Sequence, residues 1–331
     1  MLRYAARRII STLPVLIGVT FIVFSLLYLT PGDPARLILG DEASEEDVQA
    51  LRDRMGLNDP FAVQYFNYLR NLTRGDLGVS YTTGRTVTTE ILDRLPVTAR
   101  IAVLSITFAF CVGVPLGIIS ALKQYSILDN ITRILALMGL TMPNFWLALL
   151  LILFFSVKLG WLPASGLYGP AYYVMPILSI SAVSLATITR MTRSSMLEVI
   201  RQDYIRTARS KGLPERTVIF KHALKNALIP VVTVIGLQFA SGLGGAVVNE
   251  QVFSIPGVGK MMVDAIKARN YPVVQGGVLT LAIMFSLLNI FVDLSYALID
   301  PRIRSQYDRR QKRERKPTGE AAPGQGERSN D

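Results

Sequence analysis

Long uncharged stretches alternate with charged segments along the whole chain. A helix that crosses the hydrocarbon core of a bilayer, about 30 Å thick, needs about 20 mostly apolar residues. Five stretches of that length contain no Asp, Glu, Lys or Arg, and a sixth helix is expected where a longer uncharged stretch ends. The pattern therefore predicts an all-α polytopic membrane protein with six transmembrane helices. They cover residues 9–29, 101–122, 134–157, 173–189, 226–249 and 271–292.

Composition supports the membrane class. Of the 331 residues, 50% are hydrophobic and only 18% are charged, against about 25% charged in an average soluble domain. A single cysteine, Cys111, and a single histidine, His222, exclude a disulfide framework and a zinc site rich in Cys or His. We expect Cys111 to be a small buried hydrophobe, and we expect no catalytic site, metal or directly bound cofactor.

The distribution of basic residues predicts the orientation, because Lys and Arg are retained on the cytoplasmic side. Three arginines precede the first span, and residues 190–225 contain nine basic and three acidic residues. Residues 30–96 carry seven arginines against eleven acids, which places them outside. Both termini are therefore predicted to be cytoplasmic. The net charge of +11 then reflects topology and requires no nucleic acid.

The extracytoplasmic insert, residues 30–96, is too polar to span a membrane and too long for a plain loop. Acids at the start of residues 41–57 and an apolar face predict one helix, and residues 60–72 predict a second. Residues 75–92 have strand and turn character. The insert is either a docking surface for a soluble partner or a cap that stabilises the bundle.

The cytoplasmic segment 190–226 carries a distinct pattern. Asp203 to Ser210 favours a helix, Gly212 suits a left-handed helix end, and Pro214 blocks continuation. A second helix from Glu215 would run into the next span. Such a helix, turn and helix could act as a rigid lever between a soluble motor and the membrane. The alternative is an ordinary basic loop.

This segment resembles the coupling loop of ATP-binding-cassette importer permeases, whose pattern is roughly E-A-A, three residues, Gly, nine residues, then I-x-L-P. Ala208 takes the third position of the triplet and Gly212 follows at the right spacing, but Arg206 and Thr207 replace Glu and Ala. The form RTARxKG is typical of the peptide branch. The resemblance implies that the coupling residues are Tyr204, Arg206, Thr207, Ala208, Lys211, Gly212, Leu213 and Pro214.

The resemblance extends over nearly the whole chain. It includes TPGDPARLI after the first span, GDLGVSY in the insert, LGWLPASG after the third span, NEQVFSIPGVGKM after the fifth, NYPVVQG before the sixth and VDLSYALIDPRIR at the end. These motifs resemble one permease subunit of the dipeptide, oligopeptide, glutathione and nickel importers, the type with a large insert after the first span. That family implies a second permease in a heterodimer, two cytoplasmic ATPases that use ATP, and an extracytoplasmic solute-binding protein.

The resulting domain prediction has four parts. Residues 1–29 form the cytoplasmic amino terminus and first span, and residues 30–96 form the insert. Residues 97–300 form the permease core with coupling loop 190–226. Residues 301–331 form a basic, disordered cytoplasmic tail.

Two further groups of residues are candidates for a role in transport. The GVGK sequence at Gly257–Lys260 lacks the Gly and Ser or Thr of a phosphate loop, so we interpret it as part of an outer turn, which the resemblance places at the mouth near the binding protein. The mouth residues are Glu250, Phe253, Pro256, Gly257 and Gly259. Helix packing, or a lining of the path, is expected for Ser241, Gly242, Gly244, Gly245 and Asp293.

The leading hypothesis is a permease subunit of an ATP-driven peptide importer in the bacterial inner membrane, with glutathione or nickel chelates as alternative cargo. A stand-alone secondary transporter would be expected to show ionisable residues at mid-membrane or an inverted repeat, and the sequence shows neither. An intramembrane enzyme would need paired carboxylates, a His pair or a Ser-His arrangement, and none is apparent.

Overall fold

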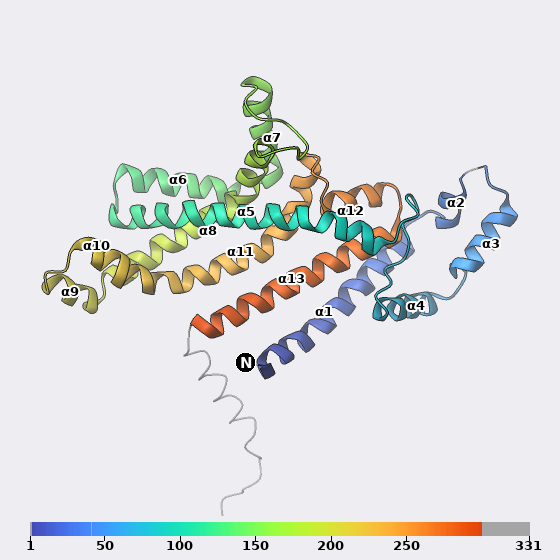
Figure 1. Ribbon diagram of the computed structural model, residues 1–331, viewed down its shortest axis with the longest axis horizontal. Helices are drawn as coiled ribbons and strands as arrows, with labels where there is room; N and C mark the ends of the chain where they lie inside the picture. The colour runs from blue at the N-terminus through green and yellow to red at the C-terminus, as the bar shows by residue number, and fades with distance from the viewer. Residues whose placement is uncertain (1, 41, 300–331) are drawn as a thin grey trace, which may run out of the picture.

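The computed structural model describes residues 2–40 and 42–299 and is an elongated bundle of helices (Figure 1). The long helices pack in a continuous series: α5 on α8, α8 on α11, α11 on α13 and α13 on α1. The membrane helices are α1 (Leu2–Leu29), α5 (Val87–Leu122), α6 (Ile127–Thr141), α7 (Asn144–Leu151) with the π-helical η1 (Ile152–Lys158), α8 (Ala171–Ile200), α11 (Leu224–Val252) and α13 (Tyr271–Ile299). The shorter elements are α2 (Pro34–Leu39), α3 (Glu45–Met55), α4 (Phe61–Thr73), α9 (Asp203–Ser210), α10 (Glu215–Thr217), the π-helical η2 (Val218–Ala223) and α12 (Val258–Lys267).

Five helices are long and apolar enough to cross a membrane, and a bent pair would make a sixth span. The bent pair is α6 with α7 and η1, which meet at 110°. The transmembrane span expected over residues 134–157 is therefore not one continuous helix but is broken at residues 142 and 143. The physical reason is Pro143, because proline disfavours helical backbone at the preceding residue, and Met142 is extended, with φ −76° and ψ 128°.

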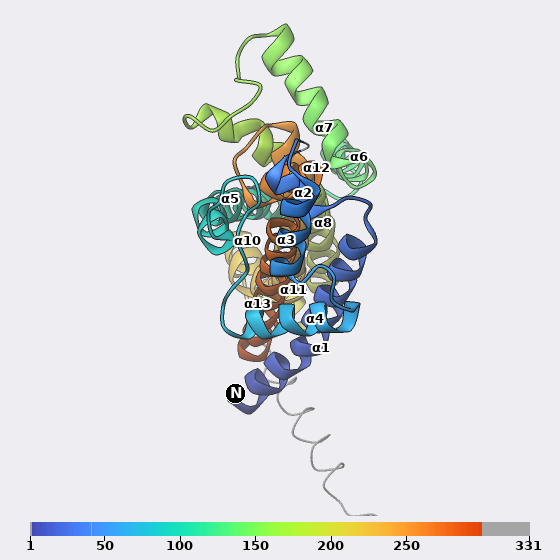
Figure 2. The ribbon, with the colours of Figure 1, turned by 90° about the vertical axis from the view of Figure 1, so that its right-hand side faces the viewer.

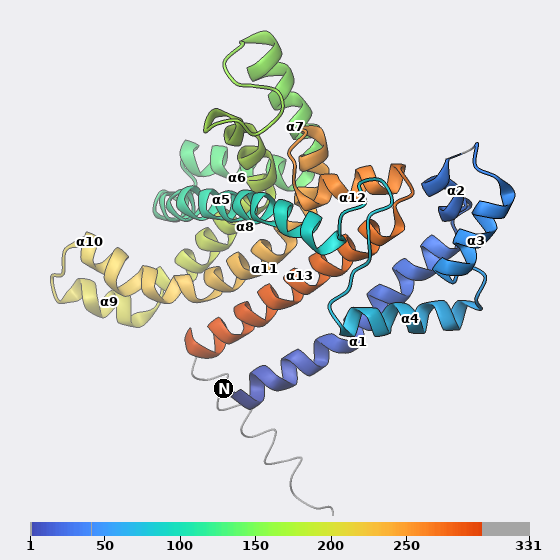
Figure 3. The ribbon, with the colours of Figure 1, turned by 45° about the vertical axis from the view of Figure 1, so that its right-hand side comes forward.

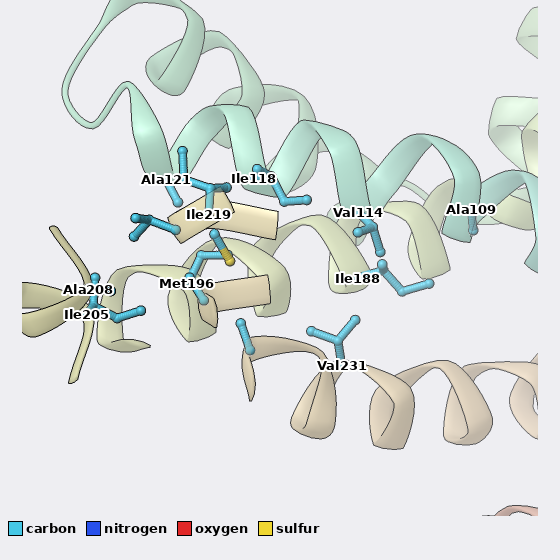
Figure 4. Packing of buried hydrophobic residues seen from close by; sticks show 13 residues of the cluster. Ala109, Val114, Ile118, Ala121, Ile188, Met196, Ile205, Ala208, Ile219 and Val231 are labelled. Atoms are coloured by element: carbon cyan, nitrogen blue, oxygen red, sulfur yellow. The ribbon is translucent and has the colours of Figure 1, made fainter. Parts of the chain in front are cut away.

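Helices α5 and α8 form the most extensive contact of the bundle. Ile188 and Thr189 of α8 lie against Gly113, where an added Cβ would be tightly packed at 3.1–3.2 Å. Thr192 lies against Gly117, where an added Cβ would collide with it. The close approach continues into a buried cluster to which α5, α8, α9, η2 and α11 all contribute (Figure 4). Small residues allow this approach, as they do in many membrane helix pairs.

Helix α5 begins earlier than the sequence pattern predicted. Val87 and Ile91 are buried against α12 and α13, and this packing overrides the weak helix propensity of the Thr-rich stretch. The strand expected over residues 75–92 is therefore wrong from Val87 onward, and a single isolated bridge joins Val79 to Thr86. Cys111, further along α5, is exposed, so the expectation that it is buried is also wrong.

The insert contains three helices beside the end of α1 (Figures 2 and 3). Ser44 caps α3, and Gly56 ends it in the left-handed conformation. Helix α4 packs on α1 through aromatic rings, with Phe24 centred 5.4 Å from Tyr65 and 5.5 Å from Tyr68. These contacts hold the insert on the bundle.

A buried ion pair joins α6 to α8 near the end that carries α9. Arg193 donates from Nε to one oxygen of Asp129 at 2.7 Å and from Nη2 to the other at 2.8 Å. Ser120 of α5 and the backbone N–H of Tyr125 donate to the same carboxylate. Asp129 is completely buried, so these donors replace the water that a buried charge requires.

Replacing Gly117 with Ala should separate α5 from α8. The added Cβ would lie 2.6 Å from Thr192 Cβ and 2.7 Å from the carbonyl oxygen of Thr189, and overpacking of this kind costs about 1–3 kcal/mol. We expect a lower midpoint of thermal unfolding in detergent. The control is Gly18→Ala on α1, where no atom lies within 4 Å of the new Cβ. Equal midpoints for the two variants would contradict the packing.

Candidate functional site

The predicted coupling residues lie at one end of the bundle, and the insert lies at the other (Figures 1 and 3). The helix predicted from Asp203 to Ser210 is confirmed with the same bounds as α9, and α10 begins at Glu215 as expected. Gly212 between them has φ +75°, the left-handed conformation that the sequence predicted. The segment is therefore a helix, a tight turn and a second helix that continues through η2 into α11.

Helix α9 has one buried and one exposed face. Ile205 is completely buried and Ala208 is 7% exposed, and both belong to the cluster in Figure 4. Val218 and Ile219 of η2 join the same cluster. The remaining predicted coupling residues are exposed: Tyr204, Arg206, Thr207, Lys211, Gly212, Leu213 and Pro214.

Two polar contacts that the sequence pattern did not predict hold α9 and the turn that follows it. Arg209 donates to both carboxylate oxygens of Glu215, at 3.2 Å and 2.6 Å, across the Gly212 turn. This hydrogen bonding with Glu215 raises the pKa of Arg209 above its ordinary value. Asn226 donates to the hydroxyl of Tyr204 at 2.8 Å, which ties α9 to α11. The opposite charges on the two sides of Gly-Leu-Pro were the available signal for the first contact.

The mouth residues are organised around the side chain of Glu250, which is completely buried. One oxygen accepts a hydrogen bond from the hydroxyl of Thr98 at 2.6 Å, and the other accepts from the backbone N–H of Lys260 at 3.0 Å. The Thr98 hydroxyl in turn accepts from the backbone N–H of Val258 at 2.9 Å. The carboxylate therefore fastens the start of α12 to α5 and α11.

The other mouth residues surround this carboxylate. A side chain at Gly257 or Gly259 would collide with Glu250, so both positions need glycine. Phe253 is 2% exposed, whereas Pro256 is exposed at the tip of the turn. Four of the five residues are thus buried within the clamp, and Pro256 is the one that a docked protein could touch.

Three of the small residues of α11 that were predicted to pack or line the path lie apart from the described helix contacts of this chain. Ser241 is exposed, and a Cβ at Gly242 or Gly244 would meet no described atom within 4 Å. Packing or path lining stays a prediction for these positions. The surroundings of Gly245 and the side chain of Asp293 lie outside the described residues.

A cavity of about 570 Å³ lies between the insert and the adjacent ends of α1 and α13. It is lined by polar and aromatic side chains, among them Asn67, Asn71, Tyr81 and Tyr271. Asp33 also lines the cavity, and the pKa of its carboxyl is below its ordinary value. Burial raises this pKa, but the hydrogen bonds from Arg52 and from backbone amides together lower it by more than burial raises it. The described residues contain no group of three or more His, Cys, Asp or Glu side chains that could hold a metal ion.

The fold and these two ends define a multi-pass membrane protein with a rigid segment at one end and a clamped turn at the other. Residues 113–305 match the family described as the binding-protein-dependent transport system inner membrane component, and residues 1–102 match its amino-terminal model. The chain belongs to this family and is a permease subunit of an ATP-binding-cassette importer of the inner membrane. Permeases of this family work with a partner permease, ATPases and a binding protein.

Curated relatives match nearly the full length. The dipeptide transport system permease protein DppB of Alkalihalophilus pseudofirmus is 45% identical, over 92% of this chain and 100% of its own. The glutathione transport system permease protein GsiC of Pectobacterium atrosepticum is 43% identical, over 92% of this chain and 99% of its own. Among solved structures, the inward-facing MetNI methionine ABC transporter matches with a TM-score of 0.52 and 19% identity, over 64% of this chain and 97% of its own. That likeness shows the fold alone.

Replacing Glu250 with Gln should loosen the clamped turn. The amide nitrogen cannot accept a hydrogen bond, so one of the donors, Thr98 or the Lys260 N–H, would be left buried and unsatisfied at a cost of about 1–3 kcal/mol. We expect faster hydrogen exchange of the backbone amides from residue 255 to 260. The matched control is Asp264→Asn, an acid on α12 whose side chain is 50% exposed. Unchanged exchange in Glu250→Gln would show that the carboxylate is not the clamp.

Proposed function

We propose that this chain pairs with a second, homologous permease subunit to form the translocation path of an importer for dipeptides or oligopeptides. Support comes from relatives named as dipeptide and di/tripeptide permeases, which are 45% and 42% identical over 92% of this chain. Two cytoplasmic ATP-binding subunits would hydrolyse ATP, and an external solute-binding protein would deliver the peptide. In this proposal the chain itself binds no nucleotide, metal or other cofactor.

The proposed topology places both termini and the α9 end in the cytoplasm. The excess of basic over acidic residues between 190 and 225 supports this orientation, as does the acidic balance of residues 30–96. The insert and the Glu250 clamp then face outward, where a binding protein would dock. The exposed face of α9 faces the ATPases.

The observation that carries the proposal is the two-faced α9. Its exposed residues offer a surface to a soluble subunit, while Ile205 and Ala208 are buried among residues of α5, α8, η2 and α11. A displacement of α9 by an ATPase would therefore move several membrane helices together, because packed cores shift between discrete arrangements and do not deform continuously. This gives a physical route from ATP hydrolysis to alternating access.

Glutathione is the second candidate substrate. Relatives named as glutathione permeases are 41% to 43% identical over 92% of this chain, close to the values for the peptide permeases. Glutathione is itself a small peptide, so one path could accommodate either cargo, and the binding protein would select between them.

Reconstitution tests the function directly. Proteoliposomes that contain this chain, its partner permease and the ATPases should accumulate a labelled dipeptide when ATP is inside and the binding protein is outside. Competition by unlabelled glutathione measures the second candidate. Liposomes that lack the ATPases should accumulate nothing above leakage. Uptake by the chain alone would contradict the proposal and favour a secondary transporter.

Replacing Gly212 with Val should uncouple ATP hydrolysis from uptake. A β-branched residue is strained at φ +75°, by about 1–3 kcal/mol, although no neighbour obstructs the added side chain. We expect uptake to fall at least about fivefold while ATP hydrolysis continues and membrane insertion is normal.

The matched control for this experiment is Gly212→Asn, because asparagine tolerates the left-handed conformation. It should retain most of the uptake. Equal uptake by the Val and Asn variants would show that coupling between ATP hydrolysis and uptake does not depend on the left-handed turn at Gly212.

A further inference from the structure

A groove of about 710 Å³ runs between α6 and α8 near the end that carries α9. One part of its lining is polar and basic, and the other part is apolar. The lining residues used below are Arg133, Ile134, Leu137 and Leu140 on α6 and Arg190 and Arg193 on α8.

The basic part of the groove carries two arginines without an acidic partner. Arg193 forms an ion pair with Asp129, and the two carboxylate oxygens of Asp129 also accept hydrogen bonds from the Ser120 hydroxyl and the Tyr125 backbone N–H. Arg133 and Arg190 are exposed, and neither forms a salt bridge with any residue that the structure describes. Two positive charges are therefore available at one end of the groove.

The apolar part of the groove extends along α6 away from these charges. Ile134 and Leu137 are 59% and 62% exposed, and Leu140 follows on the same helix. From Arg133 to Leu140 the helix advances by seven residues, about 10 Å. The groove thus has a charged end and an apolar track along one axis, the arrangement of an amphiphilic molecule.

We propose that this groove binds an anionic phospholipid of the cytoplasmic leaflet. The headgroup phosphate pairs with Arg133 and Arg190, and an acyl chain lies along Ile134, Leu137 and Leu140. Charge complementarity favours a lipid over a helix of another subunit, because a helix would have to bring acidic side chains into the edge of the bilayer. A phospholipid supplies the anion and the apolar chain in one molecule. The site depends on the proposed topology, which places the arginines at the cytoplasmic surface.

The test uses the purified full-length chain in detergent, titrated with phosphatidylglycerol or phosphatidylcholine and observed by native mass spectrometry. Wild type should retain phosphatidylglycerol in preference. The double variant Arg133→Gln with Arg190→Gln should bind it about thirtyfold more weakly, since each arginine near the surface adds to the attraction. The control double variant, Arg201→Gln with Arg216→Gln, removes the same charge from exposed positions outside the groove and should bind normally.

A second measurement locates the acyl chain. In Leu137→Trp, brominated phosphatidylglycerol should quench the added fluorescence, relative to wild type, more strongly than brominated phosphatidylcholine does. Equal binding of the two lipids, or equal losses in the two double variants, would overturn the proposal. Normal lipid binding with loss of association to the second permease in Arg133→Gln with Arg190→Gln would make the groove a subunit interface instead. The assays need no ATPase, peptide or binding protein, so failure of the transport proposal would leave their results readable.

Discussion

The contact between α5 and α8 positions both ends of this permease. Gly113 and Gly117 allow the two helices to approach closely: an added Cβ would be tightly packed at Gly113 and would collide with α8 at Gly117. In the first half of α5, Thr98 donates a hydrogen bond to Glu250 and accepts one from the backbone N–H of Val258. At the other end, Ser120 meets Asp129, which pairs with Arg193 of α8. Both groups of polar contacts therefore include a residue of α5, and water cannot substitute for them because the groups are buried.

The two ends differ in how they treat charge. At the mouth, a single carboxylate is satisfied by hydroxyl and backbone donors, which fixes the backbone of the turn without adding charge to the surface. At the α9 end, the locks are ion pairs, and the surface around them is basic. The first arrangement suits a turn that must keep one shape. The second holds the buried face of α9 on the bundle and leaves its other face exposed.

Local signals in the sequence predicted local structure well. Helix α9 and the turn at Gly212 follow from propensity, a glycine terminator and Leu213-Pro214, and the structure has the same bounds. Pro143 was a signal for the bend at Met142 as well. The prediction missed this bend because the stretch was identified as a span only from its lack of charged residues. By contrast, the early start of α5 depends on packing of Val87 and Ile91 against α12 and α13, which lie more than 160 residues away in sequence. The role of Glu250 was missed for the same reason, since Thr98 is 152 positions away.

The glycines of the membrane helices show why residue type alone does not assign a role. In α5, the packing of this chain explains why residues 113 and 117 are glycines, because α8 occupies the space beside both of them. In α11, Gly242 and Gly244 are equally small, but a Cβ added at either position would meet no described atom within 4 Å. Packing inside this chain therefore does not account for them. A translocation path, or a packed helix of a second permease, would require a stretch of small side chains that the rest of this chain does not cover.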